Sequence, residues 1–405
     1  MIYLNIMLLM LPTPPAAAVD MQPVYSLTLL GGQYFFSSSR GALTGNFSAL
    51  AAPGMRFNEY WELFPSVSSS YQGTKQVVDL VGAGTLFQEQ LDNRLAVKTV
   101  YTPDDTRWKI KSSLGYKAHW LKETRDEHWS RDLFDSTRMD ANLETEFIYK
   151  DPFSVRGGLT YFMTSFPNYS SLESMAAFDF QGQTLARELV GDKVLNANGQ
   201  MLTLTGNFPY QGAAFEFGYT LLRQDYPRQH LVNAAGNLVS PLREDLAHMF
   251  DAGVKLPMET ALSAKTVLSF DIGYTQNTSN QNNYDALRTQ FQSGYYDYSE
   301  YRFSPGAAVV TGDRDRPTTW GLNAVISMRS YPHRLIQNST GLYLGEELAT
   351  TSWLLAGSVS RILLPRVKLL AQCQYGSSRS NQQFQQFYKY SYTAISYLFG
   401  VSYDF

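Results

Sequence analysis

Apolar and polar side chains alternate one by one along much of the chain. The clearest stretch is residues 108–120, with the sequence WKIKSSLGYKAHW. One parity holds large apolar side chains such as Trp108 and Leu114, and the other holds lysines and His119. Successive side chains of a β-strand point to opposite faces, so this stretch predicts a strand with one apolar and one polar face. Capped segments with a 3.6-residue period are not found, which predicts an all-β chain.

The same alternation recurs and predicts sixteen strands, an even number. Their expected ranges are 25–36, 57–69, 76–88, 93–101, 108–120, 139–149, 154–166, 200–207, 213–223, 248–257, 264–275, 318–330, 334–345, 350–362, 367–375 and 392–405. The alternation is weak in 57–88, 200–207 and 334–345, so fourteen or eighteen strands stay open.

Strand length and loop length together favour a transmembrane barrel over a soluble β-sandwich or solenoid. Residues 108–120 form a long strand that spans roughly 40 Å when extended. An ordinary globular strand has only about 5–6 residues. Tilted in a barrel, such a strand covers the ~30 Å apolar band of a bilayer. Lipid offers no hydrogen-bond partner to the backbone, so the sheet must close. The expected connections also alternate between short (102–107, 150–152, 207–212, 363–366) and long (122–138, 167–200, 224–246, 276–317).

Composition excludes several functional classes. The 405-residue chain has 33 Lys+Arg and 36 Asp+Glu, a net charge of −3, which argues against a nucleic-acid binder. The one cysteine, Cys373, excludes a disulfide framework and a cysteine-based zinc site, and its parity places it toward lipid as a small apolar side chain. Its five histidines lack metal-site spacing, and no hydrolase motif is found, so we expect no cofactor, no metal and no enzymatic activity.

The N-terminus has the features of an export signal. Residues 1–12 are a short uncharged apolar stretch, and Ala16-Ala17-Ala18 forms a small-residue cleavage site. No Lys or Arg precedes the apolar stretch, which departs from the usual signal. We expect residues 1–18 to be a signal peptide and residues 19–405 to form a single barrel domain.

The C-terminal segment 392–405 has the sequence YTAISYLFGVSYDF and ends on an aromatic residue. Its Gly400, Tyr403 and Phe405 resemble the C-terminal β-signal of bacterial outer-membrane β-barrel proteins; Leu398 stands where that signal has a polar residue. The resemblance implies an antiparallel up-and-down barrel in the outer membrane of a Gram-negative envelope, surrounded by lipid. It also implies the barrel assembly machinery as a partner during biogenesis. With an even number of strands, both termini are expected in the periplasm.

Charged side chains on the polar parity are the first candidate functional residues. Lysines on one strand are expected to face acidic side chains on the next, across the lumen-facing side of the wall. These six residues are Lys109, Lys111, Lys117, Asp140, Glu144 and Glu146. They are expected either to create a field that selects solutes by charge or to brace the wall as cross-strand ion pairs.

The longest expected loop, 276–317, is rich in Asn, Gln and Tyr. Three interpretations stay open: a constriction or plug with Arg314 and Arg316 near its end, an outward tyrosine-rich surface that binds a sugar or protein, and an unstructured solvated loop.

The pattern as a whole indicates a porin-like channel or transporter for small polar solutes. The alternative is a structural barrel that anchors envelope proteins through its surface loops, as a scaffold or a homo-oligomer. A barrel-borne hydrolase ranks third.

Overall fold

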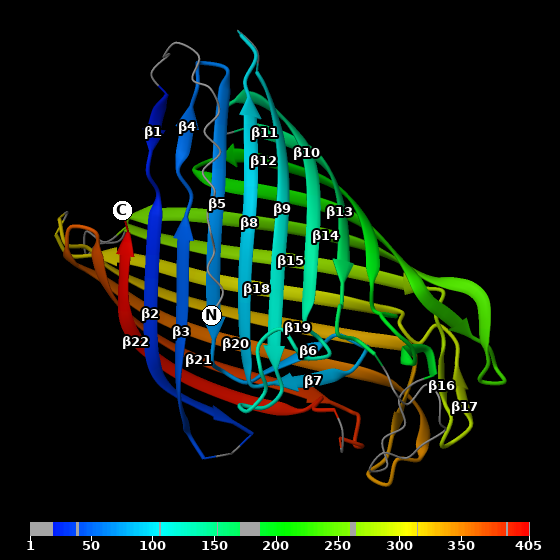
Figure 1. Ribbon diagram of the computed structural model, residues 1–405. Coiled ribbons are helices and arrows are strands. Elements are labelled where there is room, and N and C mark those ends of the chain that lie inside the picture. Colours follow the sequence, from blue (N-terminus) through cyan, green and yellow to red (C-terminus); the bar gives the residue numbers. More distant parts are fainter. Residues whose placement is uncertain are drawn as a thin grey trace.

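A computed structural model of the protein describes residues 19–37, 40–104, 107–151, 153–170, 187–259, 265–313, 315–385 and 388–404. Within these residues sixteen long strands form the wall of a barrel (Figure 1). They are β2 (Tyr25–Phe36), β3 (Ala42–Ala51), β5 (Trp61–Gln72), β8 (Glu89–Tyr101), β9 (Trp108–Lys122), β10 (Ser136–Lys150), β11 (Phe153–Ser165), β12 (Ala197–Tyr210), β13 (Ala213–Val232), β14 (Leu238–Glu259), β15 (Lys265–Ser279), β18 (Tyr298–Thr311), β19 (Thr318–Gln337), β20 (Tyr343–Leu364), β21 (Val367–Ser380) and β22 (Tyr392–Asp404).

Each wall strand pairs antiparallel with the next, and the first pairs with the last. The closing seam joins β2 to β22 from Ser26↔Asp404 to Phe36↔Ala394. The short strands β1 (Asp20–Gln22) and β4 (Gly54–Arg56) pair with each other and extend β2 and β3. Closure gives every wall strand a neighbour on both sides, as a lipid environment requires. The predicted antiparallel up-and-down transmembrane barrel is thereby confirmed.

The two faces of the wall differ in chemistry as the alternation predicts. The outward parity is apolar and exposed, with Leu114 67% and Leu143 53% accessible. Aromatic side chains pack together where strands meet the short turns, including Trp61 with Tyr101 at 4.7 Å between ring centroids. Aromatic side chains at the edge of an apolar band are typical of membrane-spanning barrels, where amphipathic rings sit at the lipid–water boundary.

Long and short connections lie at opposite ends of the barrel. At one end the strands are joined by short turns such as residues 211–212 and 365–366, and the described chain begins and ends there. At the other end are the longer connections, which carry the hairpins β6–β7 (Gln76–Asp79, Gly84–Phe87) and β16–β17 (Asn283–Asp285, Gln290–Gln292) and the 3₁₀ turn η2 (Arg187–Leu189) (Figure 1). We call this second end the mouth. Within the described residues, no helix is long and apolar enough to cross a membrane.

The predicted count of sixteen strands is correct, but two of its members are wrong. Residues 76–88 form the hairpin β6–β7 at the mouth instead of a wall strand. Residues 334–345 contain the end of β19, a turn and the beginning of β20. The wall strands β3 and β18 take the two vacant places. The expected loop 224–246 is also wrong, since most of it is the paired extension of β13 and β14.

Local sequence explains why the alternation of apolar and polar residues did not predict β3 and β18. Strand β3 consists mostly of small or weakly apolar residues, so its two faces differ little. Strand β18 contains Pro305 followed by Gly306, a pair that is typical of a turn. Proline has no backbone N–H to donate, and the ladder from β18 to β19 skips positions 304 and 305 before it resumes in the same register.

The predicted assembly signal lies in the strand that closes the barrel. Gly400 pairs with Leu30 across the seam, and a Cβ there would overlap the carbonyl oxygen of Leu29, so the close approach requires glycine. Tyr403 lies on the outward face. Phe405 and the predicted signal peptide 1–18 lie outside the described residues.

Candidate functional site

The hairpin β6–β7 lies between β5 and β8 in the chain and reaches β19. Several wall strands separate β19 from both β5 and β8. Asp79 accepts hydrogen bonds from Arg329 Nη1 and from the hydroxyl of Tyr331, both at 3.2 Å. The turn of the hairpin also meets the connection between β21 and β22, where the Lys389 N–H donates to the Gly84 carbonyl at 3.0 Å. The hairpin therefore crosses the mouth and is held from the far wall.

Arg334 of β19 is the centre of this attachment. Its guanidinium lies between two tyrosine rings, 4.1 Å from the Tyr295 centroid and 4.0 Å from that of Tyr331. It donates to the carbonyls of Tyr295 and Gly82, and only 3% of the residue is exposed. Gly82 has a φ of 73°, a backbone conformation that glycine adopts without strain. One buried side chain thus ties two separate loops to the wall.

A second junction is built around Glu188 of η2. Its Oε1 accepts hydrogen bonds from Asn283 Nδ2 at 2.9 Å and from the Tyr296 hydroxyl at 3.0 Å. Its backbone carbonyl accepts a hydrogen bond from Gln229 Nε2 on β13 at 2.9 Å. The connection between β11 and β12 is therefore joined to β13 and to the connection that carries β16–β17.

Arg243 on the wall continues this junction. It binds Asp245 through two nitrogens, with the shortest contact at 2.6 Å, and donates to Gln229 Oε1 at 3.1 Å. The Tyr296 ring lies 4.0 Å from its guanidinium carbon. Bidentate and stacked contacts fix a guanidinium in direction, so this arginine positions the loop side chains that meet it.

Glu188 is 1% exposed, and its Oε2 has no hydrogen-bond partner within the described residues. Burial raises the pKa of Glu188 to about 7, although the hydrogen bonds from Asn283 and Tyr296 act in the opposite direction. The carboxyl therefore changes its charge near neutral pH at the point where these loops join.

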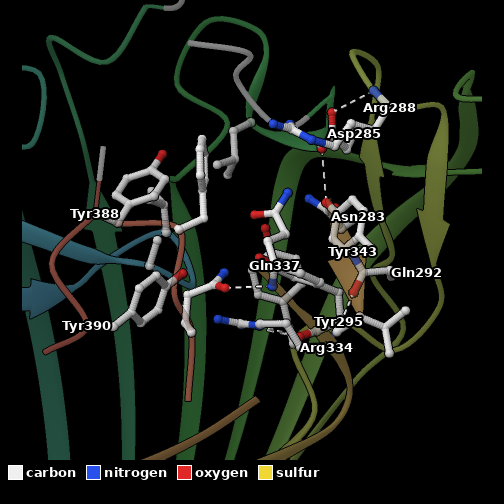
Figure 2. A pocket seen from close by; sticks show the side chains of 17 residues that line it. Asn283, Asp285, Arg288, Gln292, Tyr295, Arg334, Gln337, Tyr343, Tyr388 and Tyr390 are labelled. Carbon is white, nitrogen blue, oxygen red and sulfur yellow. Dashed lines mark hydrogen bonds and ion pairs between the residues drawn. The ribbon is translucent and has the colours of Figure 1, made fainter. Parts of the chain in front are cut away.

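The loops of the mouth enclose a cavity of about 120 Å³ (Figure 2). Its wall mixes aromatic rings with amide and charged side chains from several connections. The labelled members are Asn283, Asp285, Arg288, Gln292, Tyr295, Arg334, Gln337, Tyr343, Tyr388 and Tyr390. Concave sites with apolar walls and a few converging polar groups are typical of small-molecule binding sites.

The charges predicted on the lumen face lie on β9 and β10, and most of them form ion pairs. Lys111 Nζ lies 2.8 Å from both Glu144 and Glu146. The other two ion pairs run to β8: Lys117 pairs with Asp92 at 2.8 Å, and Asp140 pairs with Arg94 at 3.2 Å. Lys109 is opposite Glu146 in the strand register. This arrangement favours the bracing interpretation for Lys111 while it keeps several charges on the lumen face.

Residues 276–317 do not form one loop. They contain the end of β15, the hairpin β16–β17, the whole of β18 and a turn. Arg316 lies exposed in that turn, between β18 and β19 at the end opposite the mouth, and Arg314 lies outside the described residues. The described side chains that join loops across the mouth, such as Arg334 and Glu188, come from other positions.

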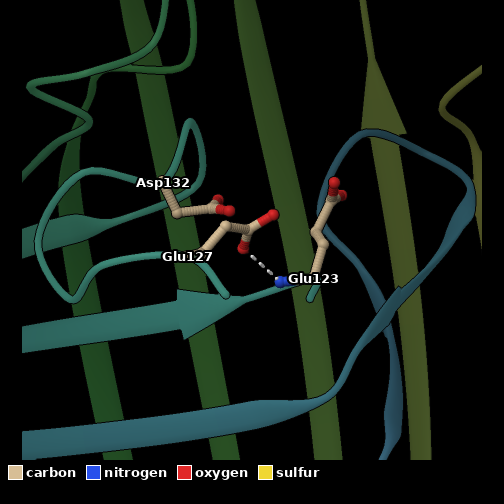
Figure 3. A group of neighbouring side chains, drawn as sticks. All are labelled: Glu123, Glu127 and Asp132. Carbon is tan, nitrogen blue, oxygen red and sulfur yellow. Dashed lines mark hydrogen bonds between the residues drawn. The ribbon is translucent and has the colours of Figure 1, made fainter. Parts of the chain in front are cut away.

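Three carboxylates gather in the connection between β9 and β10, from Glu123, Glu127 and Asp132 (Figure 3). Their ligand atoms lie within 4.8 Å of one another, and the backbone N–H of Glu123 donates to Glu127 Oε2 at 2.7 Å. Burial, together with the neighbouring Glu123 and Glu127, raises the pKa of Asp132 to about 7. The group is compatible with a cation but has no further feature that indicates one.

Sequence reasoning missed the mouth residues Glu188, Arg243, Arg329 and Arg334. Two of these arginines lie in strand ends that the sequence analysis did not predict: Arg243 fell in the expected loop 224–246, and Arg334 fell in a separate expected strand, 334–345. Glu188 had no local signal either, because its partners come from distant connections.

Comparison with known proteins gives a likeness of fold alone. No protein-family model matches the chain, and no curated protein matches its sequence at a significant level. A bacterial polysaccharide outer membrane secretin is similar in structure with a TM-score of 0.47, 8% identity, and coverage of 94% of this chain and 98% of that one. A loop L8 deletion mutant of OmpT, an outer membrane protein of Vibrio cholerae, has a TM-score of 0.46 and 10% identity, and 95% and 99% of the chains are covered.

OccD3 of Pseudomonas aeruginosa has a TM-score of 0.46 and 8% identity, with 94% of this chain and 91% of that chain covered. At such identities a shared fold does not indicate a shared function.

Proposed function

We propose that the protein is an outer-membrane channel for small polar solutes whose mouth is narrowed by loops that fold inward. The observation that supports this proposal is the difference between the two faces of the wall strands. The outer face is apolar, and the inner face has charged pairs such as Lys111–Glu144. A barrel of sixteen strands is wide enough for water inside unless loops fill it. Polar solutes are therefore expected to pass along the charged wall and through the mouth.

The proposal includes an orientation. Short turns are typical of the periplasmic end of such barrels and long loops of the outer end. Both termini are then periplasmic, and the mouth faces the outside of the cell. Outer-membrane lipid surrounds the wall, and the barrel assembly machinery, acting on the strand that contains Gly400 and Tyr403, inserts it. No covalent chemistry is part of the proposal.

Single-channel recording in a planar bilayer tests the proposal. The purified protein is expected to carry a steady ionic current, and Lys109→Glu or Lys117→Glu is expected to shift ion preference toward cations. Arg316→Glu, which changes an exposed charge outside the lumen ladder, is the matched control and is expected to have a smaller effect. Absence of current at every voltage would overturn the channel.

One observation favours the alternative, a structural barrel that holds envelope protein partners or further copies of itself. Side chains at the mouth such as Phe87 and Leu189 are almost fully buried, as in a packed core. If this packing seals the lumen, the protein carries no current, and the exposed loop surfaces become the functional part.

A further inference from the structure

The cavity at the mouth is slightly smaller than a site that encloses one small ring. Its volume of about 120 Å³ is somewhat smaller than the ~150 Å³ of an engineered protein cavity that binds benzene. Phe384, Tyr388 and Tyr390 are half-buried, so the wall is not sealed on their side. The cavity therefore admits one edge of a six-membered ring, whose remaining atoms and substituents extend toward solvent.

The lining offers two kinds of contact from opposite sides. Figure 2 shows Tyr388 and Tyr390 on one side of the cavity and the polar side chains of Asn283 and Gln292 on the other. Aromatic faces pack against the C–H groups of a ring, and amides both donate and accept hydrogen bonds. A ring with C–H faces and hydroxyl edges matches both sides.

The charges in the lining are already matched by protein groups. Arg288 pairs with Asp285 at 3.0 Å, and the Tyr343 hydroxyl also donates to Asp285 at 3.0 Å. Arg334 donates to backbone carbonyls and is covered on both faces by rings. An uncharged ligand therefore leaves these contacts undisturbed, whereas an ionised one must compete with them.

One polar atom in the lining is left unsatisfied. Gln292 is 5% exposed, and its Oε1 accepts a hydrogen bond from the Leu335 N–H at 2.7 Å. Its Nε2 is buried with no hydrogen-bond partner within the described residues. A buried donor without a partner is costly, so we expect the Gln292 amide to turn toward an acceptor oxygen of a ligand in the cavity.

We infer that this cavity is a binding subsite for one ring of a neutral saccharide, with the ring faces on the tyrosines and a hydroxyl oxygen at Gln292 Nε2. The inference deepens the proposed channel, since it places a recognition site for one class of solute at the mouth. It does not require that the lumen conducts.

Isothermal titration calorimetry on the full-length protein in detergent tests the subsite with glucose, galactose, maltose and sucrose as probes. At least one of them is expected to bind, and glucuronate, which carries a carboxylate, is expected to bind several-fold more weakly than glucose. Heats from none of the four neutral sugars, or tighter binding of glucuronate than of glucose, would overturn the inference.

Two substitutions locate the binding. Gln292→Glu keeps an oxygen for the Leu335 N–H but removes the donor, and is expected to weaken sugar binding about tenfold. Tyr388→Leu removes one ring face and is expected to weaken binding several-fold. Gln383→Glu makes the same chemical change as Gln292→Glu at an exposed position of the connection that carries Tyr388, and it should leave binding unchanged.

Each variant is first checked for a folded barrel by its heat-modifiable migration in SDS gels. Unchanged binding in a folded Gln292→Glu protein would place any sugar elsewhere and refute the subsite. If the protein binds sugar but carries no current, the channel is refuted and the subsite is retained. If it carries current but binds no sugar, the subsite is refuted and the channel is retained.

Discussion

The wall and the mouth of this barrel are built from similar residues by different rules. In the wall, Lys111 and Glu144 are on adjacent strands and are 33 positions apart in the chain. In the mouth, Arg334 meets Gly82 across 252 positions, and Tyr296 meets Glu188 across 108. A two-residue period and short turns determine the wall, whereas contacts between distant loops determine the mouth.

The difference shows which region sets which property. Wall charges are paired between strands that are adjacent or one strand apart, so a single change there alters local stability and the field in the lumen. Each mouth arginine joins several segments, so a single change there can release a whole loop. We therefore expect substitutions in the mouth to affect pore width and substitutions in the wall to affect ion preference.

The largest effect of a single substitution is expected for Arg334→Met. This change removes the hydrogen bonds to the Tyr295 and Gly82 carbonyls and costs roughly 2–4 kcal/mol of local stability. The hairpin β6–β7 is then expected to leave the mouth part of the time, which raises mean single-channel conductance several-fold and adds current noise. Arg361→Met changes an exposed arginine of β20 and is the control. Equal conductance in both variants and the wild type would show that Arg334 does not hold the hairpin.

A smaller effect is expected in the wall, from Lys111→Met. The loss of this lysine leaves Glu144 and Glu146 without their shared partner and is expected to lower the free energy of unfolding by about 1–3 kcal/mol, measured in urea. Lys98→Met removes the same charge from an exposed position on the lumen face of β8. Both variants should prefer cations more than the wild type, but only Lys111→Met should be destabilised. Equal stability of the two would mean that the ion pairs do not brace the wall.

The smallest effect is a dependence on pH at Glu188. The folded chain holds its proton up to about pH 7, whereas the ordinary value is 4.5, so the folded state binds more protons between these limits. Stability from this group is fully present below about pH 4.5 and is lost as pH rises to about 7.

Thermal unfolding across this pH range measures the effect. Glu188→Gln should flatten the pH profile, while Glu346→Gln, at an exposed position, should reproduce the wild-type profile. An unchanged slope in Glu188→Gln would assign the dependence to other groups.

The sequence predicted the wall far better than the mouth, for a physical reason. Alternation reports which side of a strand meets lipid, and this signal lies within a dozen residues of chain. It failed where small residues in β3, or Pro305 in β18, weakened the contrast between the faces. The partners of Glu188 and Arg334 come from connections far away in the chain, and no local pattern indicates them.

The most direct measurement is single-channel conductance after residues 75–88 are replaced by a short Gly-Ser link, compared with the wild type in the same bilayer. If the loops set the width of a water-filled barrel, conductance rises several-fold while ion preference stays close to that of the wild type. A folded shortened protein with unchanged conductance, or with no current at all, would contradict this account.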